Sequence, residues 1–98
     1  MKKIEALSVI DRLERLVAMF GGPYENERSE FNNLVALLRN GPMKSPNFRY
    51  KLAEVEQLAI EGFSTRKFAK HAGGLMQLRV WALGNLDTVR SLIEEEWD

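Results

Sequence analysis

The sequence predicts an all-α fold, a compact bundle of about five helices without a β-sheet. Over most of the chain, apolar residues recur at intervals of three and four, which places them on one face of a helix. Glycine and proline stand mainly between these periodic segments and mark their ends. No stretch alternates apolar and polar residues over more than a few positions, as a half-buried strand would.

Residues 3–20 form the first predicted helix. Gly21-Gly22 ends it, because glycine takes the left-handed conformation after a helix without steric cost. Its apolar face is made by residues at intervals of three and four: Ala6, Ile10, Leu13, Val17 and Phe20.

The second and third predicted helices cover residues 24–39 and 46–61. Pro23 stands at the start of the second helix, and Asn40-Gly41-Pro42 follows its end. Ser45-Pro46 begins the third, since serine caps a helix N-terminus and proline suits the first helical position. Gly62 ends this helix.

Residues 65–83 allow two interpretations. In the first, Ser64 caps a short helix, 65–72, and Gly73-Gly74 forms a turn before a further helix, 75–83. In the second, one helix continues from 65 to 83. Two adjacent interior glycines would cost roughly 2 kcal/mol relative to alanine, so we favour the break.

The last predicted helix covers residues 86–97, after Gly84-Asn85. Asn85 or Asp87 caps it. If Gly73-Gly74 does not break the chain, some of these helices merge and the bundle has four helices. Glu94-Glu95-Glu96 lies at the negative end of the helix dipole, which is unfavourable. We therefore expect this end to fray.

Composition limits the classes of function. A chain of 98 residues predicts one helical domain covering residues 1–98. The absence of cysteine excludes disulfides, thiolate metal sites and cysteine nucleophiles. Charges interrupt the first residues, so we expect no secretion signal, and no apolar run approaches the roughly 18 residues of a membrane span. We expect a cytoplasmic protein that does not enter a membrane.

Catalytic and metal-binding patterns do not stand out. His71 is the only histidine, and positions three and four residues away from it hold no carboxylate. Its neighbours Arg66, Lys67 and Lys70 make a basic surface the simplest interpretation. The paired carboxylates elsewhere come without histidine. We expect no enzymatic activity, no metal site and no cofactor.

Charge is balanced overall but unevenly distributed. Residues 44–80 hold seven positive and three negative charges, and residues 81–98 hold one positive and five negative charges. Within the basic part, the pattern formed by Gly62, Ser64, Phe68, Ala69 and Gly73 resembles the opening of a Cro/repressor-type helix-turn-helix unit. Alanine is small where two such helices cross, and glycine allows the turn between them.

The resemblance implies a DNA-binding function for residues 62–83, with the second helix in the major groove. It departs from the pattern after Gly73, because Gly74 is an additional residue and the following helix is almost wholly apolar. The residues that would contact phosphates or base edges form a basic rim: Arg66, Lys67, Lys70, His71, Gln77 and Arg79.

The apolar character of residues 75–83 points to a second kind of function. A helix that is apolar almost all round is either buried on most sides or meets a partner, and exposed apolar patches usually mark interfaces. Aromatic residues are favoured anchors there. The candidate interface residues are Tyr50, Met76, Leu78 and Trp81.

The function that we favour from the sequence is protein–protein binding by a small non-catalytic helical protein. It would act as an adaptor or inhibitor, of the kind that phages and mobile elements encode, an analogy based on size and class. The partner is another protein, and a second copy of the chain (a homodimer) is one candidate. The alternative is the helix-turn-helix regulator described above.

Overall fold

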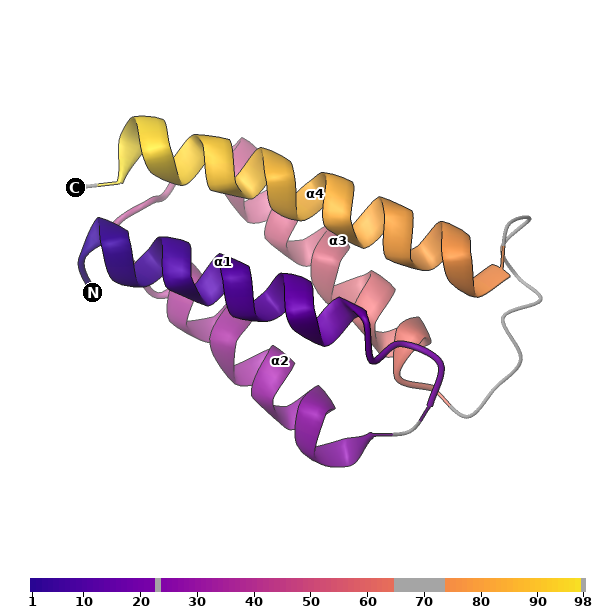
Figure 1. Ribbon diagram of the computed structural model, residues 1–98. Coiled ribbons are helices and arrows are strands. Elements are labelled where there is room, and N and C mark those ends of the chain that lie inside the picture. Colours follow the sequence, from indigo (N-terminus) through magenta and orange to yellow (C-terminus); the bar gives the residue numbers. More distant parts are fainter. Residues whose placement is uncertain (23, 65–73, 98) are drawn as a thin grey trace.

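Four α-helices make up the computed structural model, which describes residues 1–22, 24–64 and 74–97 (Figure 1). No strand occurs within these residues. The all-α prediction is confirmed, and the described residues form four helices rather than about five. Their bounds are α1 Lys3–Val17, α2 Glu25–Arg39, α3 Pro46–Gly62 and α4 Gly74–Glu96.

The helices alternate in direction along the bundle, so that both chain termini lie at one end (Figure 1). α1 packs against α2 and α4, and α3 packs against the same two helices from the other side. The radius of gyration is 13.1 Å, close to the value of about 12.6 Å expected for a compact domain of this length. The chain is therefore a compact helical globule.

The predicted helix ends agree with the structure to within a few residues. The Ser45 hydroxyl accepts a hydrogen bond from the Phe48 amide at 3.3 Å, and Pro46 is the first residue of α3. α1 ends at Val17 instead of Phe20, because the following amides bond to carbonyls only three residues back. Gly21 has φ 122°, a conformation that favours glycine, which confirms the predicted stop.

The predicted break at Gly84-Asn85 is wrong, because α4 continues through both residues to Glu96. One interior glycine costs only about 1 kcal/mol relative to alanine. Burial of a continuous apolar stripe outweighs that cost. The stripe passes directly over the predicted break and consists of Leu78, Ala82, Leu86, Val89 and Ile93.

The start of α4 bears on the second interpretation of residues 65–83, a single continuous helix. Gly74 has φ 61°, so a single right-handed helix cannot pass through this position. The predicted helix 65–72 lies outside the described residues. At the other end, α4 keeps its helical form through Glu94-Glu95-Glu96, where we expected fraying.

Trp97 accounts for the order at the end of α4. Its side chain is only 3% exposed, and its indole nitrogen donates a hydrogen bond to the Met1 carbonyl oxygen at 3.1 Å. The Lys3 ammonium also donates to the Glu94 carbonyl oxygen at 2.9 Å. These contacts join the two ends of the chain and offset the unfavourable dipole.

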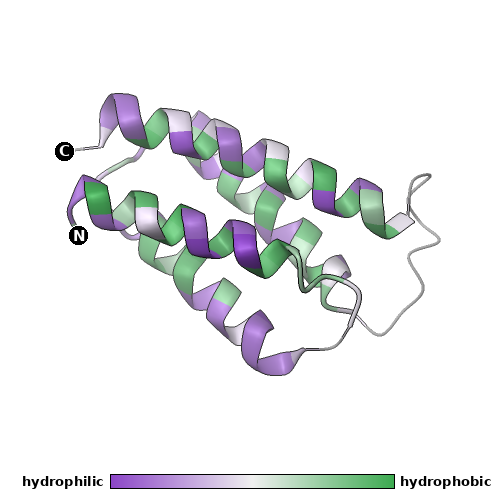
Figure 2. Cartoon of the chain, in the orientation of Figure 1, coloured by the Kyte–Doolittle hydropathy of each residue, from purple (hydrophilic) through white to green (hydrophobic). Residues whose placement is uncertain are grey.

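The apolar core runs the length of the bundle, and no polar or charged residue is buried among the described residues. At the end distant from the termini, Phe20, Phe31 and Phe63 form an aromatic cluster with ring centroids 5.1–6.2 Å apart. Figure 2 shows hydrophilic residues concentrated over the first turns of α2 and the last turn of α4. The bundle thus buries one face of every helix.

Ion pairs on the surface join neighbouring helices. Arg90 of α4 binds Asp11 of α1 at 2.6 Å and also pairs with Glu14. Arg12 of α1 binds Glu30 of α2 with two hydrogen bonds of 2.6 and 2.9 Å. The hydrogen bond from Arg12 lowers the pKa of Glu30 below its ordinary value.

Candidate functional site

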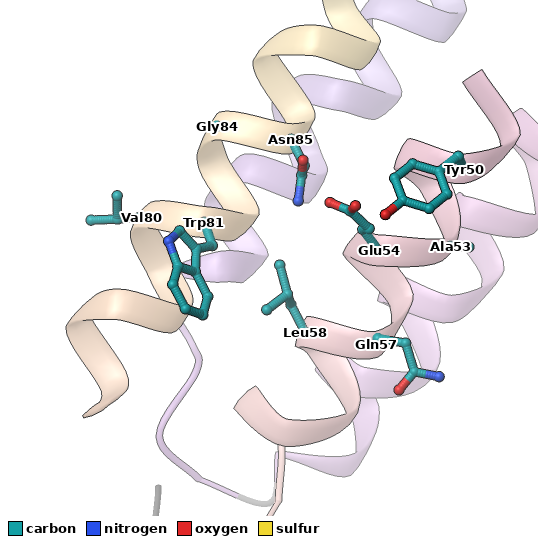
Figure 3. A pocket seen from close by; sticks show the side chains of 9 residues that line it. All are labelled: Tyr50, Ala53, Glu54, Gln57, Leu58, Val80, Trp81, Gly84 and Asn85. Atoms are coloured by element: carbon teal, nitrogen blue, oxygen red, sulfur yellow. The ribbon is translucent and has the colours of Figure 1, made fainter. Parts of the chain in front are cut away.

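A surface groove lies between α3 and α4 (Figure 3). Its volume is about 780 Å³, within the range of about 300–1,000 Å³ typical of ligand pockets. Most of its lining is apolar. The groove is lined by Tyr50, Ala53, Glu54, Gln57, Leu58, Val80, Trp81, Gly84 and Asn85.

Helical spacing explains why these residues share one groove. The lining residues of α3 lie at intervals of three and four from Tyr50 to Leu58, which places them on one face. Val80, Trp81, Gly84 and Asn85 form the corresponding face of α4. Figure 3 shows Glu54 and Leu58 directed from α3 toward α4 and Asn85 directed back, with the Trp81 ring further along α4.

Two aromatic side chains bound the groove, one from each helix. Tyr50 of α3 is 61% exposed and Trp81 of α4 is 46% exposed. Val80, beside Trp81, is 57% exposed. Large apolar residues with this much exposure, gathered around a concave surface, are typical of interfaces rather than of isolated surface positions.

Glu54 is the only carboxylate among the described residues that line the groove. The Tyr50 hydroxyl bonds to this carboxylate, and that contact raises the pKa of Tyr50 above its ordinary value. The Lys51 ammonium lies 3.9 Å from the same carboxylate, outside the groove lining. Figure 3 shows the Glu54 carboxylate between the Tyr50 ring and the Asn85 amide.

The structure separates the predicted interface residues into three groups. Tyr50 and Trp81 both line the groove, one on α3 and the other on α4. Met76 is 75% exposed on the first turn of α4 but does not line the groove. Leu78 is fully buried, because it begins the core-facing stripe of α4. Leu78 is therefore a core residue, and its assignment as an exposed anchor is corrected here.

Residues 75–83 are thus neither wholly buried nor wholly exposed. Leu78 and Ala82 face the core, whereas Met76, Val80, Trp81 and Leu83 are exposed. Central burial of this helix among the others, one of the two possibilities from the sequence, does not occur.

The predicted basic rim is only partly described. Arg66, Lys67, Lys70 and His71 lie outside the described residues. Gln77 is half-buried. Arg79 donates from its guanidinium to the carbonyl oxygens of Ala18 at 3.3 Å and Phe20 at 2.7 Å. Its described contacts therefore join α4 to the turn after α1.

Several lining residues were not predicted, chiefly Glu54, Leu58, Gly84 and Asn85. Glu54 and Leu58 could have been predicted on α3, because they follow Tyr50 at intervals of four residues and therefore share its helical face. For α4, the predicted break at Gly84-Asn85 hid the second wall, because a groove of this length requires an uninterrupted helix. The pairing of α3 with α4 is a tertiary feature that periodicity alone does not give.

Other kinds of site find no basis in the described part of the chain. Within it, no three histidine, cysteine, aspartate or glutamate side chains come together as metal ligands could. None of the four helices combines the length and the apolar character that crossing a bilayer requires. Comparison of the chain with known protein families, curated proteins and solved structures finds no match.

Proposed function

We propose that this chain is a small non-catalytic protein that binds another protein through the groove between α3 and α4. The observation that carries the proposal is the position of Tyr50 and Trp81, exposed on opposite walls of one apolar groove. Tryptophan and tyrosine are enriched among the residues that dominate binding energy at interfaces. An adaptor or inhibitor acting in the cytoplasm is the role that we propose for it.

A partner that covers both aromatic residues would gain the most binding free energy. Burying apolar surface gains about 25 cal/mol per Å², and Trp or Tyr contributes a large rigid area with few rotatable bonds. Truncation of an anchor at the centre of an interface costs about 2 kcal/mol or more. Trp81→Ala is therefore expected to weaken binding at least tenfold.

Site-specific crosslinking tests the proposal. A photoreactive phenylalanine analogue replaces Trp81 in one variant and Leu37 in another, expressed in the source cells. Leu37 is a matched control, because it is 50% exposed on α2, away from the groove. A protein crosslinked only through position 81 is then purified and titrated against the wild-type chain, Trp81→Ala and Leu37→Ala.

The expected result is a dissociation constant that rises at least tenfold for Trp81→Ala and stays unchanged for Leu37→Ala. Equal crosslinking from both positions, or equal affinities of both variants, would contradict the proposal. Sedimentation equilibrium of the pure chain checks for a homodimer. A dimer that dissociates on Trp81→Ala would identify the second copy as the partner.

A further inference from the structure

Given the proposed function, on which this inference rests, we infer that the partner segment is an amphipathic helix carrying a lysine or arginine directed at Glu54. The basic side chain would lie beside the Tyr50 ring, with apolar residues one turn before and after it. This assignment names the chemistry of the partner, which the proposed function leaves open.

The charge of the groove is the first argument. Among the described residues that line the groove, Glu54 is the only carboxylate and no lysine or arginine occurs. A partner that covers this carboxylate without supplying a positive charge would leave it partly desolvated, which is unfavourable. Lys51 is not among the lining residues, and its ammonium lies 3.9 Å from this carboxylate; such a partly exposed pair offsets little of that cost.

The aromatic walls favour the same group. A cation within about 6 Å of an aromatic ring centroid is attracted to the face of the ring, most strongly for tryptophan. The Lys51 ammonium already lies 5.7 Å from the centroid of the Tyr50 ring. A partner cation that reaches Glu54 would lie beside the Tyr50 ring, since Figure 3 shows the Glu54 carboxylate next to that ring.

The shape of the groove indicates a helix as the occupant. From Tyr50 to Leu58 the lining extends about 12 Å along α3, at 1.5 Å per residue. That is slightly more than two helical turns, the length over which anchors at i, i+3 or i+4 and i+7 engage a helical groove. A third helix laid along α3 and α4 satisfies its own backbone groups internally, as the groove lining offers few polar partners.

Gly84 adds an independent observation. A Cβ placed on this residue would meet no atom within 4 Å, so the packing of the chain itself does not require glycine there. Glycine in a helix interior lowers stability by about 0.5–1 kcal/mol relative to alanine. Gly84 is one of the lining residues of α4, and its lack of a side chain permits close approach of a partner backbone there.

Selection from a helical peptide library tests the inference with the full-length chain. The displayed probes are 18-residue amphipathic helices, with the central position of the apolar face randomised to all amino acids. Selection against the wild-type chain should enrich lysine or arginine at that position. Binding of the enriched peptides should weaken at least tenfold on Trp81→Ala and about fivefold on Glu54→Gln.

Exchanging the charges of Glu54 and of the peptide distinguishes the contribution of the ion pair to affinity from that of apolar packing. Peptides with glutamate at the central position should bind Glu54→Lys better than they bind the wild-type chain. Glu95→Gln removes an equivalent charge from an exposed position near the end of α4, so it should leave affinity unchanged. Circular dichroism of every variant shows whether the helices remain folded.

The outcomes distinguish this inference from the proposed function. Peptides that depend on Trp81 but show no basic preference and no response to Glu54→Gln would overturn the inference and leave the proposed function standing. Absence of any peptide that depends on Trp81 would count against both. A dimer of the pure chain in sedimentation equilibrium that dissociates on Trp81→Ala would overturn the separate partner in favour of a second copy.

Discussion

The guanidinium of Arg79 donates a hydrogen bond to the backbone carbonyl oxygen of Phe20 at 2.7 Å, which links α4 to the turn after α1. The same terminal nitrogen also reaches the Ala18 carbonyl oxygen at 3.3 Å. Beside this contact, the Gly21 amide bonds to the Gly62 carbonyl oxygen at 2.8 Å. The turn after α1 is thus held by α3 and by α4.

Arg79→Met should lower the free energy of unfolding by about 1–2 kcal/mol, because methionine keeps much of the apolar stem and loses the charged donor. Urea denaturation monitored by circular dichroism measures the change. Arg28→Met is the control, since the Arg28 side chain is exposed on α2. Equal effects of the two substitutions would contradict a structural role for the Arg79 contact.

The same variant bears on the DNA-binding alternative, which stays a prediction. If the Arg79 side chain contacts base edges, Arg79→Met should lower the affinity of the chain for labelled duplex DNA. We expect instead that the wild-type chain shows no steep salt-dependent binding of mixed-sequence duplex. Affinity in the range of about 10⁻⁴ to 10⁻⁶ M that falls steeply with salt would favour the DNA interpretation.

Two helical glycines should respond to alanine in opposite directions. Gly84→Ala should raise the free energy of unfolding by about 0.5–1 kcal/mol, because no atom blocks the new methyl group and alanine favours the helix. At Gly62 the added Cβ would lie 2.4 Å from the Phe20 ring, so Gly62→Ala should destabilise the chain. Thermal unfolding of both variants provides the comparison.

Predictability from the sequence differed between local and tertiary features. The starts and ends of α2 and α3 were predictable because proline, serine and glycine act within one turn. The continuity of α4 was not, since Gly84 is locally unfavourable and only burial of Leu86 and Val89 compensates for it.

The same distinction applies to the candidate site. Tyr50 and Trp81 could be proposed as anchors because aromatic residues beside apolar helical positions favour interfaces. Leu78 was misassigned because periodicity does not show which side of a nearly all-apolar helix meets the core. Glu54 was missed since its position in the groove depends on α3 lying against α4.

The Tyr50 hydroxyl should report on the charge of Glu54. Its bond to the Glu54 carboxylate favours the neutral phenol, which raises the pKa of Tyr50. Glu54→Gln should therefore lower that pKa toward the ordinary value of about 10. The measurement is the absorbance of phenolate against pH in a Tyr24→Phe background, where Tyr50 is the remaining tyrosine. An unchanged or higher pKa would contradict the contact.

The Arg12–Glu30 pair should contribute to stability in a pH-dependent way. Because the pKa of Glu30 is lowered in the folded chain, the contribution is present above the pKa of the unfolded carboxyl, about 4.3. It is lost as the pH falls through the lower folded value. A double-mutant cycle with Arg12→Met and Glu30→Gln isolates the pair, and its coupling energy should disappear in that acidic range. A coupling energy independent of pH would exclude this mechanism.

Trp97 should determine the stability of the end of the bundle that holds both termini. A Cβ on Gly41 would lie 2.3 Å from the Trp97 ring, so the loop before α3 packs directly on the indole. Trp97→Phe removes the donor to the Met1 carbonyl oxygen and part of the ring, and should cost about 1–2 kcal/mol. Trp81→Phe is the matched control, because Trp81 is 46% exposed and should show a smaller loss. In Trp97→Phe, hydrogen exchange of backbone amides should accelerate in the last turn of α4 and the first turn of α1. The amides around Phe20, Phe31 and Phe63 should stay protected. Uniform acceleration would show instead that the two ends of the bundle unfold as one unit.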